Sequence, residues 1–135
     1  MTELSVQAKV GDNSGIDVKT KPIRSGLTRW AGGWDPDTGV FYKEINAQID
    51  QAFKNVELNL KHAGGKGWSQ VFRVNSYHVP INNEALEAMV RNFKVYMPDH
   101  QPIWTCVGVT RLGEDDMRVE IEVVAHDPEG EKSTQ

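Results

Sequence analysis

The sequence predicts an α+β fold in which two helices cover one face of a mixed sheet. Two stretches carry apolar residues at helical spacing, and the segments around them are rich in β-branched and aromatic residues. Helix-like and strand-like stretches alternate along the chain, as in a two-layer domain. The 135 residues suit one domain. We therefore expect a single domain over 1–135, with loose termini at about 1–20 and 127–135.

The clearest helix is predicted from Glu44 to Ala63, after a possible strand from Pro22 to Ala31. Residues 32–39, with the sequence GGWDPDTG, separate the two and are dense in turn-forming residues. Gly64 and Gly65 follow the helix and favour a left-handed stop. The apolar stripe of the helix, with spacings of three and four, consists of Ile45, Ile49, Phe53, Val56 and Leu60.

The second half of the chain predicts a strand, a helix and two further strands. Trp68 to Val79 forms the strand, and the helix from Glu84 to Met97 is capped from Asn82 or Asn83. Strands from Ile103 to Leu112 and Met117 to Ala125 flank the turn residues 113–116, which favours a hairpin. The apolar stripe of this second helix consists of Leu86, Met89, Val90, Phe93 and Met97.

Composition excludes several classes of protein. Fifteen Lys and Arg against nineteen Asp and Glu give a net charge of −4, which argues against a nucleic-acid partner. The single cysteine excludes an intrachain disulfide. No stretch is apolar enough for a signal peptide or a membrane helix, so we expect a cytoplasmic protein without a membrane partner. The four histidines lie too far apart for a local zinc pattern, and no metal site is predicted.

The motif Gly64-Gly65-Lys66-Gly67 has the composition of a phosphate-binding loop but not its spacing. In such a loop four residues separate a first glycine from the Gly-Lys pair, and serine or threonine follows the lysine. Leu60 and Gly67 hold those positions, so we interpret the segment as a helix-ending turn.

The last predicted strand has one apolar and one charged face. Glu120 and Glu122 alternate with Val119, Ile121 and Val123, and the apolar side should meet the helices. The glutamates then face either water or an interface, where a carboxylate could serve as an acid or base.

Cys106 shares a face of its strand with Trp104. A lone strand cysteine is commonly a small buried hydrophobe. We expect this face to point away from the apolar one, which would place Trp104 in a ligand pocket or a subunit contact. That apolar face consists of Ile103, Thr105, Val107 and Val109.

Five segments together resemble the reactive intermediate deaminase family (RidA or YjgF-like, also labelled endoribonuclease L-PSP). They are TCVGV at 105–109, VEIEVVA at 119–125, GWDPDTG at 33–39, the helix at 48–65 and the strand at 68–77. The resemblance spans about residues 22–126. It implies a chorismate-mutase-like fold, a homotrimer with a central β-barrel, and a small-molecule cleft at each subunit interface. Typical members hydrolyse enamines or imines such as 2-aminoacrylate to a keto acid and ammonia, without metal or organic cofactor.

The resemblance also implies roles for individual residues. Cys106 matches a cysteine that lines the cleft, and Glu120 matches a glutamate that positions or activates water. The family's carboxylate-binding arginine is Trp104 here. An indole has one N–H and no charge, whereas a guanidinium forms a charged fork.

Two further positions depart from the family pattern. Trp30 stands where a glycine admits substrate, and Glu87 stands where the second helix carries an asparagine. Arg29 and Arg73 are candidates for a replacement cation. These four residues and Trp104 are the substrate-binding candidates.

Three functions follow as hypotheses. The first is hydrolysis of a small imine or enamine with altered or lost activity, because the carboxylate clamp is missing. The second is a non-catalytic trimer that binds a small molecule or a protein through the same clefts. The third is ribonuclease activity, against which the acidic balance argues.

Overall fold

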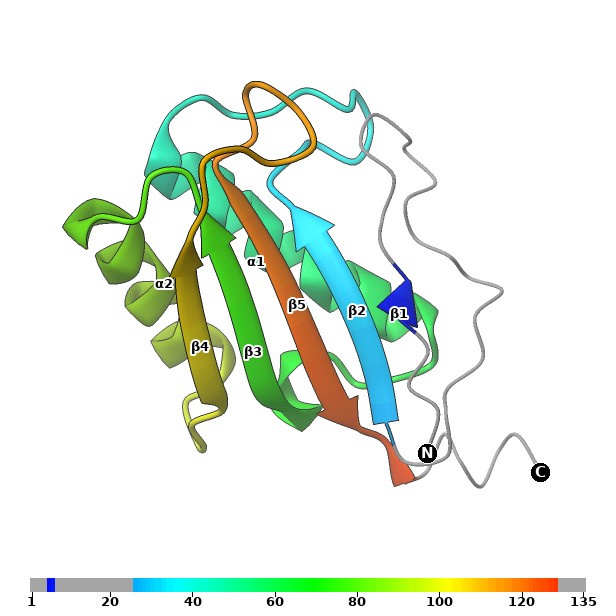
Figure 1. The fold of residues 1–135 in the computed structure, drawn as a ribbon. Coiled ribbons are helices and arrows are strands. Elements are labelled where there is room, and N and C mark those ends of the chain that lie inside the picture. The colour runs from blue at the N-terminus through cyan, green and yellow to red at the C-terminus, as the bar shows by residue number, and fades with distance from the viewer. Residues whose placement is uncertain (1–4, 7–25, 129–135) are drawn as a thin grey trace.

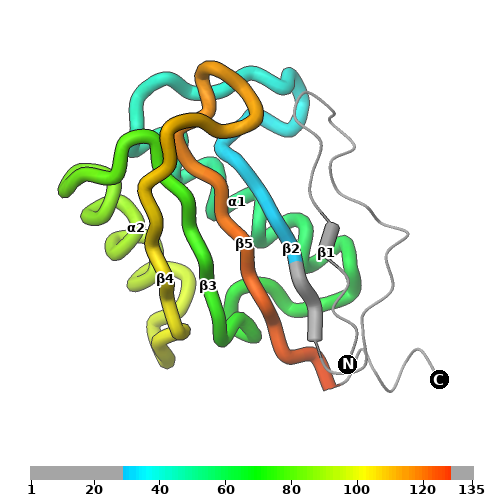
Figure 2. Tube along the Cα trace, in the orientation of Figure 1, coloured from blue at the N-terminus to red at the C-terminus, as the bar shows by residue number. Residues whose placement is uncertain are grey.

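The computed structural model describes residues 5–6 and 26–128, and within them one mixed sheet has both α-helices on the same face (Figure 1). The order across the sheet is β1-β2-β5-β3-β4 (Figure 2). The α+β prediction is confirmed. The expected loose termini fall almost wholly outside the described residues. The elements are β1 (Ser5–Val6), β2 (Gly26–Gly32), α1 (Ile45–His62), the short 3₁₀ helix η1 (Trp68–Gln70), β3 (Val71–His78), α2 (Asn83–Tyr96), β4 (Ile103–Gly108) and β5 (Val119–His126).

Helix α1 forms as its sequence predicts. All five residues of its apolar stripe are buried in the core. The Glu44 side chain caps its start by accepting hydrogen bonds from the backbone N–H groups of Asn46 and Ala47. At its end Gly64 has a φ of 95°, and the N–H of Gly65 donates to Leu60 at 2.9 Å. This is the left-handed glycine stop that the sequence predicts.

The apolar stripe predicted for α2 is confirmed in part: Met89 and Met97 are buried and Phe93 packs against the core, whereas Val90 lies outside it. Asn82 caps the helix, accepting from the N–H of Ala85 at 2.9 Å. The buried side of α2 consists of Ala85, Ala88, Met89 and Asn92, whereas Val90 is 39% exposed. The two alanines belong to the core, and the larger Val90 lies on the open side of the helix. This open side of α2 forms one wall of a cavity.

The predicted hairpin between the last two strands is wrong. Strand β3 lies between β4 and β5, pairing in parallel with β4 and antiparallel with β5. Helix α2 provides the crossover that parallel strands need, and it carries β4 to the sheet edge. Strand β5 fills the centre because its residues Val119, Ile121 and Val123 are fully buried. Turn residues at 113–116 indicate a reversal of direction but not which strands pair.

The strand predicted from Trp68 begins later than expected. Trp68 belongs to η1, and β3 begins at Val71. The Trp68 ring stacks on Phe53 with centroids 4.6 Å apart, and its Nε1 donates to the Phe53 carbonyl at 2.9 Å. Core packing therefore overrides the strand pattern at Trp68. Strand β2 begins at Gly26 and residues 22–25 lie outside the described part.

The turn after β2 is fastened to α1. The Asp35 carboxylate accepts from the N–H groups of Asp37 and Thr38 at 2.9 and 3.0 Å, and these bonds lower the pKa of Asp35. A Cβ at Gly33 would overlap the backbone carbonyl of Gln48. Only glycine permits this approach, which fixes the end of β2 against the helix.

Candidate functional site

The sheet has one face covered by α1 and α2 and one uncovered face (Figure 1). We call these the covered face and the uncovered face. Strand register places Cys106 beside Ser76 and opposite Ile121 across β3, all on the covered face. Glu120 is paired with Tyr77 and points to the uncovered face. The two candidate catalytic residues therefore lie on opposite faces of the sheet.

Trp104 and Cys106 lie on the opposite face of β4 from Ile103 and Val107, as predicted, and it is the apolar face that is exposed. Ile103 is 70% exposed and Val107 is 40% exposed, whereas Trp104 is half-buried and packs against the core. Parallel pairing explains the difference, because it sets Trp104 beside the buried Val74 of β3. The apolar face of β4 is thus the uncovered one, and Trp104 and Cys106 face the helices.

A polar cluster on β3 holds Trp104 and Cys106. The indole Nε1 of Trp104 donates to Ser76 Oγ at 2.9 Å, and His78 Nε2 lies 2.9 Å from the same oxygen. Ser76 and His78 are fully buried. Burial lowers the pKa of His78 to about 4, so its ring is neutral at neutral pH.

Cys106 is a thiol rather than a thiolate in this environment. Burial raises its pKa, and a hydrogen bond from Ser76 offsets part of that rise. Because the thiolate is the nucleophilic form, this geometry suits Cys106 to lining a site better than to attacking a substrate.

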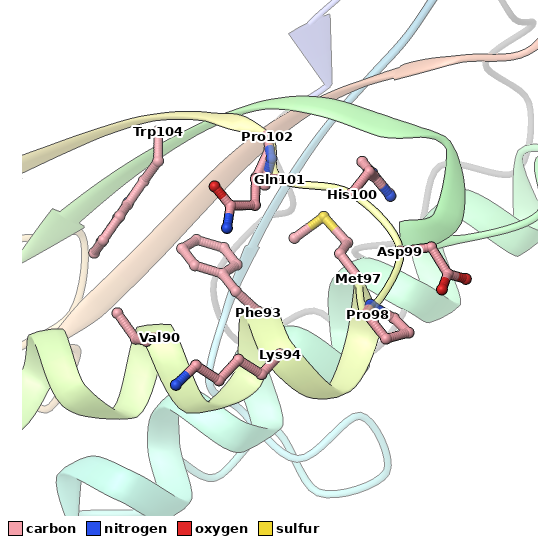
Figure 3. A pocket seen from close by; sticks show the side chains of 10 residues that line it. All are labelled: Val90, Phe93, Lys94, Met97, Pro98, Asp99, His100, Gln101, Pro102 and Trp104. Carbon is pink, nitrogen blue, oxygen red and sulfur yellow. The ribbon is translucent and has the colours of Figure 1, made fainter.

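A cavity of about 550 Å³ opens between α2 and the start of β4 (Figure 3). Phe93 and Trp104 meet edge to face there, with ring centroids 5.0 Å apart. The exposed side of α2 provides the other wall. The apolar lining residues are Val90, Phe93, Met97, Pro98, Pro102 and Trp104.

Four polar residues complete the lining of the cavity. Gln101 directs its amide between Trp104 and Phe93 in Figure 3. His100 Nε2 lies 2.7 Å from the carbonyl oxygen of Val71 and can donate to it. The other two, of opposite charge, are Lys94 and Asp99.

On the uncovered face, Glu120 lies beside an aromatic pair. Trp30 of β2 stacks on Tyr77 of β3, with centroids 5.8 Å apart and ring planes inclined by 13°. The two rings cross β5, which lies between those strands. Glu120 is 8% exposed. Burial, followed by the charges of Glu122 and Glu120, raises the pKa of Tyr77.

The remaining candidates do not gather at one place within the chain. Arg29 is 4% exposed and pairs with Val123, so it lies on the covered face. Arg73 is exposed on β3, near Tyr77. Glu87 is exposed on α2, one turn before Val90. Arg29 is thus ruled out as a cation for the face that carries Trp30 and Glu120.

Sequence reasoning missed four residues that shape these places: Ser76, Tyr77, His78 and Lys94. Ser76 and His78 continue the period-two pattern of Val74 along one strand, which indicates a shared face. The pairing with β4 was needed to place them beside Cys106. Nothing in the sequence marks Lys94 as a cavity residue.

The described residues contain neither a cluster of metal ligands nor a membrane-spanning helix. In residues 5–6 and 26–128, no three His, Cys, Asp or Glu side chains are grouped as metal ligands. Neither α1 nor α2, the α-helices of that part, has the length and apolar character to span a membrane.

Comparison with known proteins agrees with this fold. Residues 23–127 match the family model described as Endoribonuclease L-PSP. The RutC family protein YjgH of Escherichia coli strain K12 is 30% identical over 109 residues, covering 79% of this chain and 81% of the relative.

Among solved structures, the YjgF gene product of E. coli has a TM-score of 0.70 at 21% identity, covering 90% of this chain and 97% of that chain. E. coli TdcF with bound serine has a TM-score of 0.67 at 23% identity, covering 76% and 81%. These two show the fold, and the family model and YjgH carry the assignment. The chain therefore belongs to the endoribonuclease L-PSP family of YjgF/RidA-like proteins.

Proposed function

We propose that the protein is a homotrimer that hydrolyses small imines or enamines in clefts between its subunits. The observation that carries this proposal is the separation of Glu120 from Cys106 and Trp104 on opposite faces of one sheet. A single chain cannot bring these side chains to one substrate. A neighbouring copy that sets its uncovered face beside β4 would do so. The uncovered face, with its stacked rings and two carboxylates, suits such a contact.

The chemistry assigns one main task to Glu120. Its carboxylate takes a proton from water while the water oxygen bonds to the imine carbon and the C=N electron pair moves to nitrogen. The nitrogen receives this proton from Glu120, and then the proton of the new hydroxyl group by way of the same carboxylate, and it leaves as ammonia when the C=O bond forms. The products are a carbonyl compound and ammonia, and Cys106 and Trp104 line the cleft.

The substrate differs from the amino-acid-derived imines of typical family members. Trp104 replaces their carboxylate-binding arginine, and its one N–H is already bonded to Ser76. Position 104 therefore has no donor left for a carboxylate. Two indoles, at Trp30 and Trp104, favour a flat ligand. The serine bound to TdcF supports a small ligand for this fold.

A second candidate is a trimer that binds ligand without turnover. The stacked Trp30 and Tyr77 rings cross the strand of Glu120, which is 8% exposed. Water reaches a carboxylate covered in this way less readily. This observation favours binding over catalysis.

Light scattering and ammonia release test both candidates. We expect a particle of about 45 kDa, three times the 15.1 kDa of one chain. Imines without a carboxylate, generated in situ by an amine oxidase, should release ammonia faster with the wild-type protein, and Glu120→Gln should abolish the increase. Glu122→Gln, on the same strand and face, is the matched control and should retain it.

Other results of these two experiments would exclude part of the proposal or support another function. A monomer at assay concentration excludes the shared cleft. Equal activity of Glu120→Gln and wild type excludes the proposed role of Glu120. Ligand binding without ammonia release supports the second candidate, and RNA cleavage that depends on Glu120 would support a ribonuclease.

A further inference from the structure

The cavity beside Trp104 lies within one chain, so it can be considered apart from trimer formation and catalysis. Its volume of about 550 Å³ falls in the range of roughly 300–1,000 Å³ typical of small-molecule sites. Figure 3 shows α2, residues 98–102 and Trp104 surrounding it. Such pockets combine apolar walls with a few polar groups, and this one has both.

The walls favour a flat, apolar group. Trp104 is held by its hydrogen bond to Ser76 and meets Phe93 with ring planes inclined by 78°. The fixed indole leaves its surface toward the cavity as a flat wall (Figure 3). Met97 adds an unbranched thioether side chain, which adapts to irregular shapes. An aromatic ring on the ligand matches these surfaces.

The charges favour an anionic group at one side of the cavity. Within the described part of the chain, Lys94 makes no ion pair or hydrogen bond that would neutralise its ammonium group. Asp99 carries the opposite charge, but its carboxylate points away from the other labelled side chains in Figure 3, whereas Lys94 extends toward Val90. Of the two charged residues that line the cavity, Lys94 is thus the one whose side chain runs toward the wall formed by Val90.

The position of Lys94 in the last turn of α2 strengthens its expected effect on an anionic ligand. Carbonyl groups at a helix C-terminus carry partial negative charge and repel an anion. Lys94 lies in that turn. A carboxylate in the cavity is therefore favoured with the lysine and disfavoured without it.

We propose that this cavity binds a small aromatic monocarboxylic acid, with its ring between Trp104 and Val90 and its carboxylate on Lys94. The site differs from the substrate carboxylate position of typical family members, because the cation comes from α2 instead of β4. Lys94 would supply a positive charge in a chain that has Trp104 in place of the arginine. The proposal does not require that the ligand be hydrolysed.

A matched pair of ligands tests the charge. Phenylacetate and phenylacetamide have the same shape and differ in charge, and ligand-observed NMR titration of the full chain gives their affinities. We expect wild type to prefer phenylacetate. Lys94→Met should weaken phenylacetate about fourfold, as for an exposed ion pair, and leave phenylacetamide unchanged. Lys54→Met, which removes another exposed lysine on α1, should change neither.

A second variant tests the location. Val90→Trp places a large ring in the cavity from an exposed side of α2, and it should remove binding of both ligands while leaving the thermal unfolding midpoint nearly unchanged. Equal affinity for acid and amide, an unchanged preference in Lys94→Met, or binding to Val90→Trp would each overturn the proposal.

The outcome is separate from that of the hydrolase test. Loss of the phenylacetate preference with intact ammonia release removes this inference alone. Phenylacetate binding that depends on Lys94, in a protein without ammonia release, supports the inference and removes the hydrolase.

Discussion

The two faces of the sheet differ in how their side chains are stabilised. On the covered face, polar groups such as Ser76 and His78 are fully buried and bonded to one another. On the uncovered face, Trp30 and Tyr77 stack over β5 beside Glu120. The covered face forms the folded core. The uncovered face carries aromatic and acidic groups outside the core, as the proposed subunit contact requires.

The largest expected effect is on the covered face. Phe53 is fully buried and its ring packs against those of Trp68 and Tyr96, at centroid distances of 4.6 and 5.6 Å. Phe53→Ala should lower the free energy of unfolding by about 3–5 kcal/mol, because it removes buried area and leaves a cavity. Denaturant unfolding measures the change. Val40→Ala, at an exposed position, is the control, and an equal loss there would contradict the assignment of the core.

Local patterns in the sequence predicted the parts of the fold that local physics determines. The stripe of α1, its Gly64 stop, the cap of α2 at Asn82 and the apolar side of β5 are all confirmed. Each depends on residues close together in sequence.

Pairing across the sheet could not be predicted from the same patterns. Residues 113–116 suit a hairpin, yet β3 lies between the strands they connect. The alternation of Trp104 and Cys106 indicates a shared face but not which one, and their register against β3 decides it. Because the strand register cannot be predicted from local patterns, the sequence does not show that Cys106 and Glu120 lie on opposite faces of the sheet.

A pH-dependent loss of stability should arise from His78. Its pKa is lowered to about 4 in the folded chain, whereas an unfolded histidine titrates near about 6.5. In this range His78 is protonated in the unfolded chain and neutral in the folded chain. The free energy of unfolding therefore falls as pH decreases from about 6.5 to about 4. The slope is at most about 1.4 kcal/mol per pH unit.

Urea unfolding across this pH range measures the slope, and His78→Gln should reduce it. His62→Gln, at an exposed position near the end of α1, is the matched control. The same slope in wild type and His78→Gln would show that other groups cause the pH dependence.

Cys106 should react slowly with alkylating agents. Burial raises its pKa, and burial also hinders the reagent, so at pH 7.5 we expect iodoacetamide to react roughly tenfold more slowly with the folded than with the unfolded chain. Mass spectrometry follows the reaction at this single cysteine. Ser76→Ala should slow it further, because Ser76 stabilises the thiolate. Rapid alkylation of folded wild type would instead indicate a nucleophile on the covered face.

The smallest effect concerns the aromatic pair of the uncovered face. A double-mutant cycle of Trp30→Leu and Tyr77→Leu should give a coupling energy of about 0.5–1.5 kcal/mol, the usual value for a stacked pair. If the face is open in solution, this coupling should not depend on protein concentration. If neighbouring copies cover the face, the single variants should also weaken assembly, and unfolding midpoints should shift with concentration. A coupling of zero would mean that the rings do not stack. A coupling that appears only in the assembled state would assign the pair to the subunit contact rather than to the fold of one chain.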